Sequence, residues 1–472
     1  MHPALLLVAL VAPAPAMPDE VADLRRQIAD LQHKVDALSA PASTPTTTEH
    51  GVKTPRGGFV IQGKPKKHAS DDGEPAPAAQ PKLQIKTLFY ADFGRYTHTG
   101  FGPQLFDDGT RFPGPGNDGF DVFEITRAYL SFYFSPNASW TLRITPDVYR
   151  DVGTPAADKV GAISGFATNA DQQPNFRLKY AFLDYNDVFR DDPHLKGAKL
   201  RFGQQYNPLV DWEEHLYGYR YTSLTPWNYV SLSSTQDGLA LLGPIRFHAG
   251  EKPRAEYNIG VFDEAKFSQV EVSDEKQVMA RLSFYPFGLT GIDEGLGFTF
   301  FGDWGASNTV PDLNATAGLY RDAFIAHYNT RAWSLAGEFD YGRNAFATGN
   351  LFSAVGPADQ FGLQVTGFAA TDALAKKLLD VTTSNQRGWS TFGHVRLGES
   401  QFDLFGLAQW FEPNIRVPSD PFDFRRTVAG VSYQPADFVR FAIDDQTFNF
   451  SHPPAQSLGN INVVFLNMEF FY

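Results

Sequence analysis

Seven basic residues share one parity in stretches of the chain where apolar residues recur at every second position. Successive side chains of a β-strand point to opposite faces, so this parity places the seven together on the face opposite the apolar one. In that position they could form a ladder of positive charge, or they could pair with nearby acids such as Asp147 and Asp444. The pattern leaves both open. The seven residues are Arg127, Arg143, Arg177, Lys179, Arg201, Arg281 and Arg440.

A second group of chemically active side chains lies between residues 207 and 228, after a Gly-Gln-x-x-x-Pro sequence. The stretch from Val210 to Tyr221 carries three carboxylates, one arginine, no lysine and several aromatic rings. If this segment narrows a pore, its carboxylates favour cations or neutral solutes. Its rings could face a sugar or another organic solute, or could pack against a wall. The constriction candidates are Asp211, Trp212, Glu213, Glu214, Tyr217 and Arg220.

The sequence contains no familiar catalytic or metal-binding motif. There is no Gly-x-Ser-x-Gly elbow, no His-Glu-x-x-His helix and no phosphate-cradling glycine loop. Cysteine is absent, which excludes disulfides, thiol catalysis and cysteine-ligated metals. The formal charge of −13 disfavours nucleic-acid binding, which needs a basic surface. We therefore expect neither an enzyme nor a cofactor.

The first 81 residues are expected to lie outside the main domain. Residues 1–16 combine an apolar run with Ala14-Pro15-Ala16 and predict a signal peptide. Residues 17–40 carry a short heptad pattern, which predicts a coiled-coil helix and by simple rules favours two strands. Residues 41–81 are rich in Pro, Thr, Ala and Gly, and we interpret them as a disordered linker. The heptad positions are Val21, Ile28 and Val35 at a, and Leu24, Leu31 and Leu38 at d.

From residue 82 to residue 472, the pattern of apolar and polar residues is that of β-strands. Sixteen segments alternate apolar and polar residues, and short turns such as 135–139 alternate with long Gly/Pro/Asp-rich connections such as 150–174. Tight turns at one end and long loops at the other are typical of outer-membrane barrels. We therefore predict an all-β fold, a sixteen-stranded antiparallel transmembrane β-barrel over residues 82–472.

The last thirteen residues, Asn460–Tyr472, predict the strand that closes this barrel. Val464, Leu466, Met468, Phe470 and Tyr472 are apolar at every second position, and the chain stops on an aromatic ring. So long an apolar edge would invite aggregation in water. A lipid-facing strand with its last ring at the membrane interface explains the pattern.

Several motifs in this order resemble the phosphate-selective porin (O/P) family of Gram-negative outer membranes. They include Ile125 to Leu130, Trp140 to Asp147, Tyr180 to Tyr185, Leu200 to Pro208 and Val428 to Tyr433. The resemblance implies a sixteen-stranded homotrimeric barrel that passes small solutes. Phosphate-selective members line their pore with arginines and place lysines at a constriction. The acidic segment after Pro208 departs from that pattern.

These observations predict an outer-membrane porin for passive diffusion of small hydrophilic solutes or ions, with anions such as phosphate as one class of cargo. The expected partners are solutes, outer-membrane lipid and further copies of the chain. The alternatives are a barrel hydrolase, and a structural barrel whose N-terminal segments tether the envelope.

Overall fold

A computed structural model of the 472-residue chain divides it into two units, Met1–Gln62 and Gly63–Tyr472. The structure describes residues 81–98, 120–150, 174–230, 232–263, 276–287, 295–306, 318–343, 385–398, 400–412, 415–416, 423–451 and 461–472, all in the second unit. The predicted signal peptide, the coiled-coil helix and all but the last residue of the predicted linker lie outside the described residues. No helix within the described ranges is long and apolar enough to cross a membrane.

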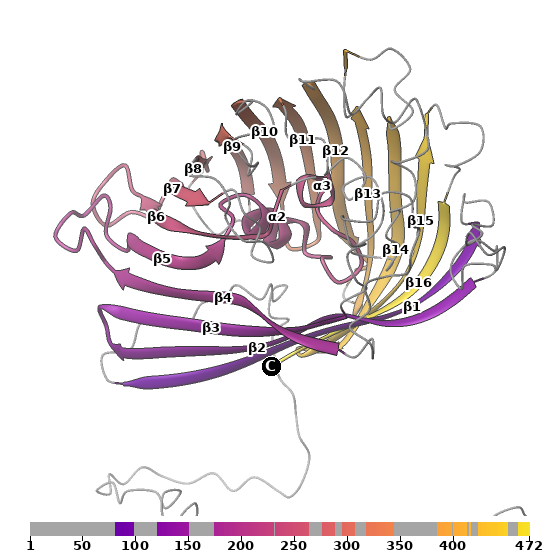
Figure 1. The fold of residues 1–472 in the computed structure, drawn as a ribbon, viewed down its shortest axis with the longest axis horizontal. Coiled ribbons are helices and arrows are strands. Elements are labelled where there is room, and N and C mark those ends of the chain that lie inside the picture. The colour runs from indigo at the N-terminus through magenta and orange to yellow at the C-terminus, as the bar shows by residue number, and fades with distance from the viewer. Residues whose placement is uncertain are drawn as a thin grey trace, which may run out of the picture. The chain divides into compact units, whose positions relative to one another are not determined.

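Sixteen antiparallel strands form one closed barrel, as predicted (Figure 1). Each strand pairs with its neighbours in sequence, and β1 pairs with β16 to close the sheet. The strands are β1 (Lys82–His98), β2 (Phe120–Asn137), β3 (Trp140–Arg150), β4 (Pro174–Asn186), β5 (Lys199–Tyr206), β6 (Thr235–Ile245), β7 (Ala255–Asp263), β8 (Lys276–Phe284), β9 (Gly295–Ala306), β10 (Gly318–Asn329), β11 (Trp333–Arg343), β12 (Asn385–Arg396), β13 (Phe402–Glu412), β14 (Phe424–Ala436), β15 (Val439–Phe450) and β16 (Ile461–Phe471).

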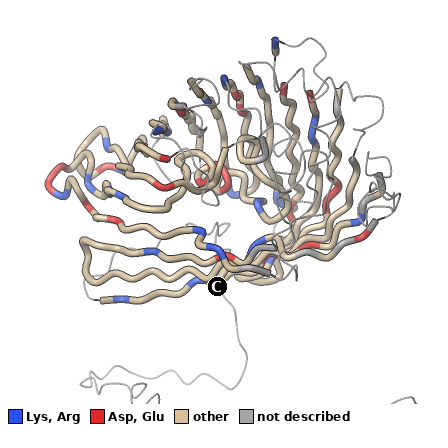
Figure 2. The backbone as a smooth tube through the Cα atoms, in the orientation of Figure 1, with Lys and Arg blue, Asp and Glu red and all other residues tan. Residues whose placement is uncertain are grey.

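The faces of the barrel are inverted relative to those of a water-soluble protein. On β16, Leu466 is 54% exposed, while its neighbours Phe465 and Asn467 are each 2% exposed. The apolar residues of the other strands are likewise exposed at alternate positions, and much of each strand in Figure 2 carries no charge. Such an apolar outer surface suits the hydrocarbon core of a membrane. A closed barrel suits it as well, because no strand edge with unpaired backbone groups is exposed to lipid.

Aromatic pairs mark the end of the barrel where the turns are short. Trp140 and Tyr185 have ring centroids 4.8 Å apart, and Tyr328 and Trp333 lie 5.3 Å apart, in each case beside a turn. Further pairs there are Phe402–Tyr433 at 4.7 Å and Phe438–Phe470 at 6.0 Å. Aromatic rings gather at both interfaces of membrane barrels, because each combines an apolar body with a polar edge or tip.

The final strand lies where the sequence predicted it. Phe89 is opposite Phe470, and Ala91 is opposite Met468, across the β1–β16 seam. Beyond the strand, the Tyr472 N–H donates to the carbonyl of Thr87 at 3.1 Å, and Thr87 donates to the Tyr472 carbonyl at 2.8 Å. The chain end therefore completes the seam.

Replacing Leu466 with arginine should destabilise the folded barrel by about 2–4 kcal/mol, the usual range for a basic residue at the bilayer midplane. Leu466 lies midway along β16 on the exposed face. Equilibrium unfolding in lipid vesicles measures this change. The control is Ala332→Arg, in the exposed β10–β11 turn, which should change the free energy of unfolding by less than about 0.5 kcal/mol. Equal effects at the two positions would contradict a lipid-facing β16.

Candidate functional site

The connection between β5 and β6 turns into the barrel, and α2 (Val210–Tyr217) and α3 (Pro226–Val230) lie within the ring of strands (Figure 1). We call residues 207–230 and 232–234 the inner loop. The segment of the loop before α2 begins with an Asn207 side chain that accepts the Leu209 N–H at 2.9 Å. Gly218, at φ 70°, ends α2 and donates to the Glu214 carbonyl, and this left-handed conformation favours glycine.

Strand side chains hold the inner loop by its backbone. Irregular backbone inside a barrel leaves carbonyl groups that need donors, and four long polar side chains supply them. Two are arginines and two are glutamines, from β8, β13, β14 and β15. The donors and carbonyls are Arg281 to Pro208 at 2.8 Å, Gln409 to Pro226 at 3.2 Å, Arg426 to Leu224 at 2.6 Å, and Gln446 to Thr222 at 2.8 Å. The loop is therefore fixed to the wall at widely separated strands.

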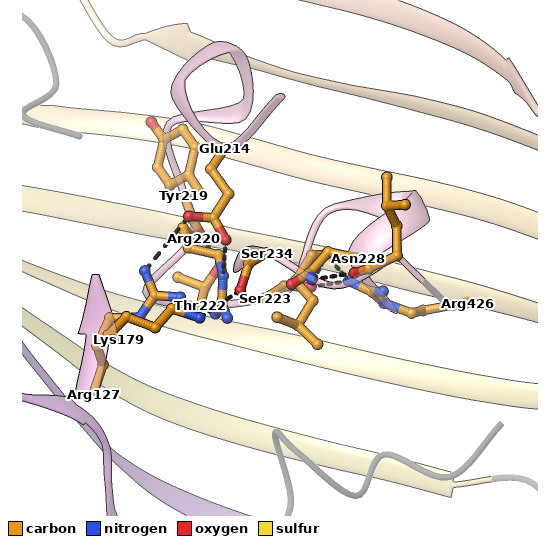
Figure 3. A network of polar contacts seen from close by, with 12 residues as sticks. Arg127, Lys179, Glu214, Tyr219, Arg220, Thr222, Ser223, Asn228, Ser234 and Arg426 are labelled. Atoms are coloured by element: carbon orange, nitrogen blue, oxygen red, sulfur yellow. Dashed lines mark hydrogen bonds and ion pairs between the residues drawn. The ribbon is translucent and has the colours of Figure 1, made fainter. Parts of the chain in front are cut away.

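An ionic network joins the other side of the loop to β2 (Figure 3). Glu214 of α2 accepts from Arg220 at 2.7 Å and from Arg127 of β2 at 3.5 Å. Burial works to raise the pKa of the Glu214 carboxyl, but Arg127 and Arg220 outweigh burial and lower that pKa below its ordinary value. Glu214 is therefore an ionised carboxylate whose negative charge is compensated by the adjacent Arg127 and Arg220 side chains.

Glu213, the preceding residue, has the opposite surroundings. Its side chain is fully buried and faces Glu338 and Asp340 of β11. Burial, and then the charge of Glu338, raise the pKa of Glu213 well above its ordinary value. Asp211 is half-buried. The cation preference assigned to these three carboxylates stays a prediction, and the geometry argues against it for Glu213 and Glu214.

The seven basic residues of the sequence pattern all lie on the inner side of the sheet. Six are at most 8% exposed, and Arg177 is half-buried. Besides Arg127, which pairs with Glu214 of α2, four of them pair with carboxylates of neighbouring strands. These pairs are Arg177 with Asp147 at 2.8 Å, Arg201 with Asp184 at 2.7 Å, Arg281 with Glu256 at 2.7 Å, and Arg440 with Glu469 at 2.5 Å. Asp444, the other acid proposed as a partner, accepts instead from Gln446 and Asn467.

Arg143 and Lys179 make a different kind of contact. The Arg143 guanidinium lies 4.5 Å from the ring centroid of Tyr180 and 5.0 Å from that of Tyr206, and it donates to the Ser131 hydroxyl. Lys179 donates to Ser234 of the inner loop at 2.6 Å. Arginine faces stack on aromatic rings through cation–π attraction, so this wall positions its guanidinium groups on tyrosines.

The aromatic residues of the inner loop pack against the wall. Tyr219 stacks on Phe405 with centroids 4.3 Å apart, and Tyr217 meets Phe392 edge-on at 5.5 Å. The Trp212 indole donates to the Tyr285 hydroxyl at 3.3 Å. All these rings are buried, which favours the packing alternative over exposed faces for a solute.

Of the four side chains that hold the loop backbone, the sequence pattern singled out Arg281 alone. Gln409, Arg426 and Gln446 carry the inward parity, but their contacts with the loop span 183 to 224 residues of chain. Glu338 and Asp340 were missed for the same reason. Parity gives the face of a residue, and it gives no information about which distant loop packs there.

No family model and no curated protein matches the chain. Among solved structures, OmpF of Salmonella typhi in complex with daunomycin is similar, with a TM-score of 0.51, 11% identity, and coverage of 83% of this chain and 97% of that one. The outer-membrane channel DcaP of Acinetobacter baumannii aligns with a TM-score of 0.47, 9% identity, and coverage of 84% and 98%. The likeness to OmpF shows the fold alone. The chain has the fold of an outer-membrane barrel.

Replacing Arg426 with alanine should loosen the inner loop, because the Leu224 carbonyl and the Ser223 hydroxyl lose their buried donor. An unsatisfied buried group costs about 1–3 kcal/mol. We expect larger and noisier single-channel currents in planar bilayers. Arg425→Ala is the matched control, since the adjacent Arg425 is exposed on the outer face. Identical current traces from the two variants would contradict the anchoring role.

Proposed function

We propose that the protein is an outer-membrane porin through which small hydrophilic solutes diffuse passively. The observation that carries the proposal is a closed barrel with a polar, charged inner face that is narrowed by an anchored loop. Such a lumen offers water and hydrogen-bonding groups to a solute, and its fixed charges filter what passes. A homotrimer belongs to the same proposal, since the motif resemblance implies it. The heptads instead favour two chains. Phosphate is one member of the anion class considered as cargo, and the acidic segment after Pro208 departs from the pattern of phosphate-selective porins.

We infer a preference for anions from the wall formed by β2 to β5. Among the inner side chains described there, six are basic and two are acidic. The basic ones are Arg127, Arg143, Arg177, Lys179, Lys199 and Arg201, and the acidic ones are Asp147 and Asp184. Glu214 of the inner loop, which pairs with Arg127 of this wall, is also matched by Arg220 of the same loop. The wall therefore keeps an excess of positive charge, which attracts anions and repels cations.

The overall acidity of the chain does not oppose this inference. A formal charge of −13 counts every residue of the chain, including the acids on the outer face. Ions inside a narrow lumen respond to the nearest fixed charges, because salt screens distant exposed charges within about 8–10 Å at physiological strength.

Reversal potentials in a salt gradient across a planar bilayer test the proposal, and we expect native channels to favour chloride over potassium. The double variant Arg177→Gln/Lys179→Gln should reduce the anion-to-cation permeability ratio. A unit charge about 8 Å away in water changes the energy of an ion by about 0.5 kcal/mol, roughly twofold in local concentration per charge.

Arg95→Gln is the control for this experiment. Arg95 lies on the outer face, paired with Asp121 at 2.5 Å, and its loss should leave the permeability ratio unchanged. Native channels that favour potassium would refute the anion preference while keeping the porin. Purified, folded protein that carries no current would refute the porin itself.

A further inference from the structure

Three carboxylic acids meet where α2 packs against β11. Glu213 comes from the inner loop, while Glu338 and Asp340 lie two residues apart on the inner face of one strand. Their exposed fractions are 0%, 3% and 0%. Within the part of the chain that the structure describes, no lysine or arginine forms an ion pair with any of them. This differs from the other inner acids, most of which face an arginine.

The surroundings of this acid cluster provide hydrogen bonds and no compensating charge. Ser390 of β12 donates to Glu338 at 3.2 Å. The Thr225 hydroxyl and the Trp227 indole N–H of the inner loop are wholly buried, lack another partner, and face Glu213 and Asp340. Gly388, also on β12, leaves room for Asp340, because a Cβ there would lie 3.2 Å from its carboxylate.

The charged groups on neighbouring elements are already engaged. On β10, Arg321 pairs with Asp303 of β9 at 2.6 Å. On α2, Glu214 is engaged by Arg127 and Arg220 on the side of the loop that faces β2. The cluster is thus left with carboxyl groups facing one another, together with neutral donors.

Three buried carboxyl groups in contact cannot all ionise. Burial penalises each charge, and the like charges repel in a medium that screens them poorly. A protonated carboxyl, by contrast, can donate its O–H to the neighbouring carboxylate, so shared protons convert repulsion into hydrogen bonds. The contact between the loop and β11 is therefore favourable only while protons are held.

We propose that Glu213, Glu338 and Asp340 form a proton-held latch that fastens the inner loop to β11 and releases it when the three carboxyls ionise. The pKa of Glu213 is raised by burial, so its contribution to the contact is complete below the ordinary glutamate pKa and is lost as the pH rises toward the raised value. Alkaline conditions therefore loosen α2 from β11. The proposal rests on the porin function only for its electrical readout.

Glu214, the next residue, responds to pH in the opposite direction. The pKa of Glu214 is lowered despite burial, because Arg127 and Arg220 favour its charge. Its ion pairs are complete above the ordinary glutamate pKa and are lost as the pH falls through the lowered value. The inner loop is thus held on both sides only between these two limits.

Infrared spectra of the purified full-length protein in D₂O test the latch without any current. We expect a C=O band of protonated carboxylic acid at neutral pH that disappears at alkaline pH. The triple variant Glu213→Gln/Glu338→Gln/Asp340→Asn should lose this band, while Asp445→Asn, which removes an exposed acid from the outer face of β15, should keep it. Absence of the band from the native protein at neutral pH would overturn the proposal.

Loop release is followed with a single engineered cysteine, since the native chain contains none. In the Asp211→Cys background, a water-soluble maleimide should label the latch-intact protein faster than the triple variant at alkaline pH, and equally fast at mildly acid pH. Comparing the two proteins at the same pH removes the effect of pH on the reactivity of the thiol itself.

In bilayers the conductance of native channels should rise over the pH range in which the infrared band fades, with no rise in the triple variant. Equal labelling of both proteins at every pH would refute the latch, whereas missing current together with latch-dependent labelling would refute only the porin.

Discussion

The structure depends on one demand of the bilayer, that every backbone N–H and C=O in hydrocarbon must find its partner within the chain. An open sheet would leave two unpaired edges, so β1 must pair with β16 and the barrel must close. The seam runs from Leu88 opposite Phe471 to His98 opposite Asn462, and the Tyr472 backbone extends it by one residue. Closure then separates an apolar outer face from a polar inner one, and every functional feature of the molecule follows from that separation.

Backbone groups inside the lumen also need hydrogen-bond partners, and there specific side chains of the wall provide them. The inner loop is irregular before α2 and between α2 and α3, so carbonyls there and at the start of α3 are not satisfied by a ladder of regular hydrogen bonds. Arg281, Gln409, Arg426 and Gln446 satisfy four of them from the wall. These side chains both meet a backbone requirement and fix the position of the inner loop. A water-filled gap could hydrate the carbonyls equally well, but it would not hold the loop against one side.

The strands could be predicted from the sequence because their period of two is a local property. Sixteen segments, the closing strand, and the inward face of the seven basic residues all follow from alternation and turn lengths. The ion pair between Arg201 and Asp184 is nearly as local, since the two residues are opposite each other on β5 and β4. The site could not be predicted in the same way. Arg426 and Ser223 are 203 residues apart, and only the path of the inner loop brings them together.

Glu213 and Glu214 show why residue type alone cannot assign charge in such a site. An α-helix turns by about 100° per residue, so adjacent side chains on α2 point to different walls of the barrel. One finds two guanidinium groups and ionises; the other finds two carboxyls and retains a proton. The acidic appearance of the segment in sequence therefore overstates the negative charge that a passing ion meets. In a lumen, the charge that selects is the charge left after local pairing, and the proposed anion preference assigns that role to the basic wall of β2 to β5.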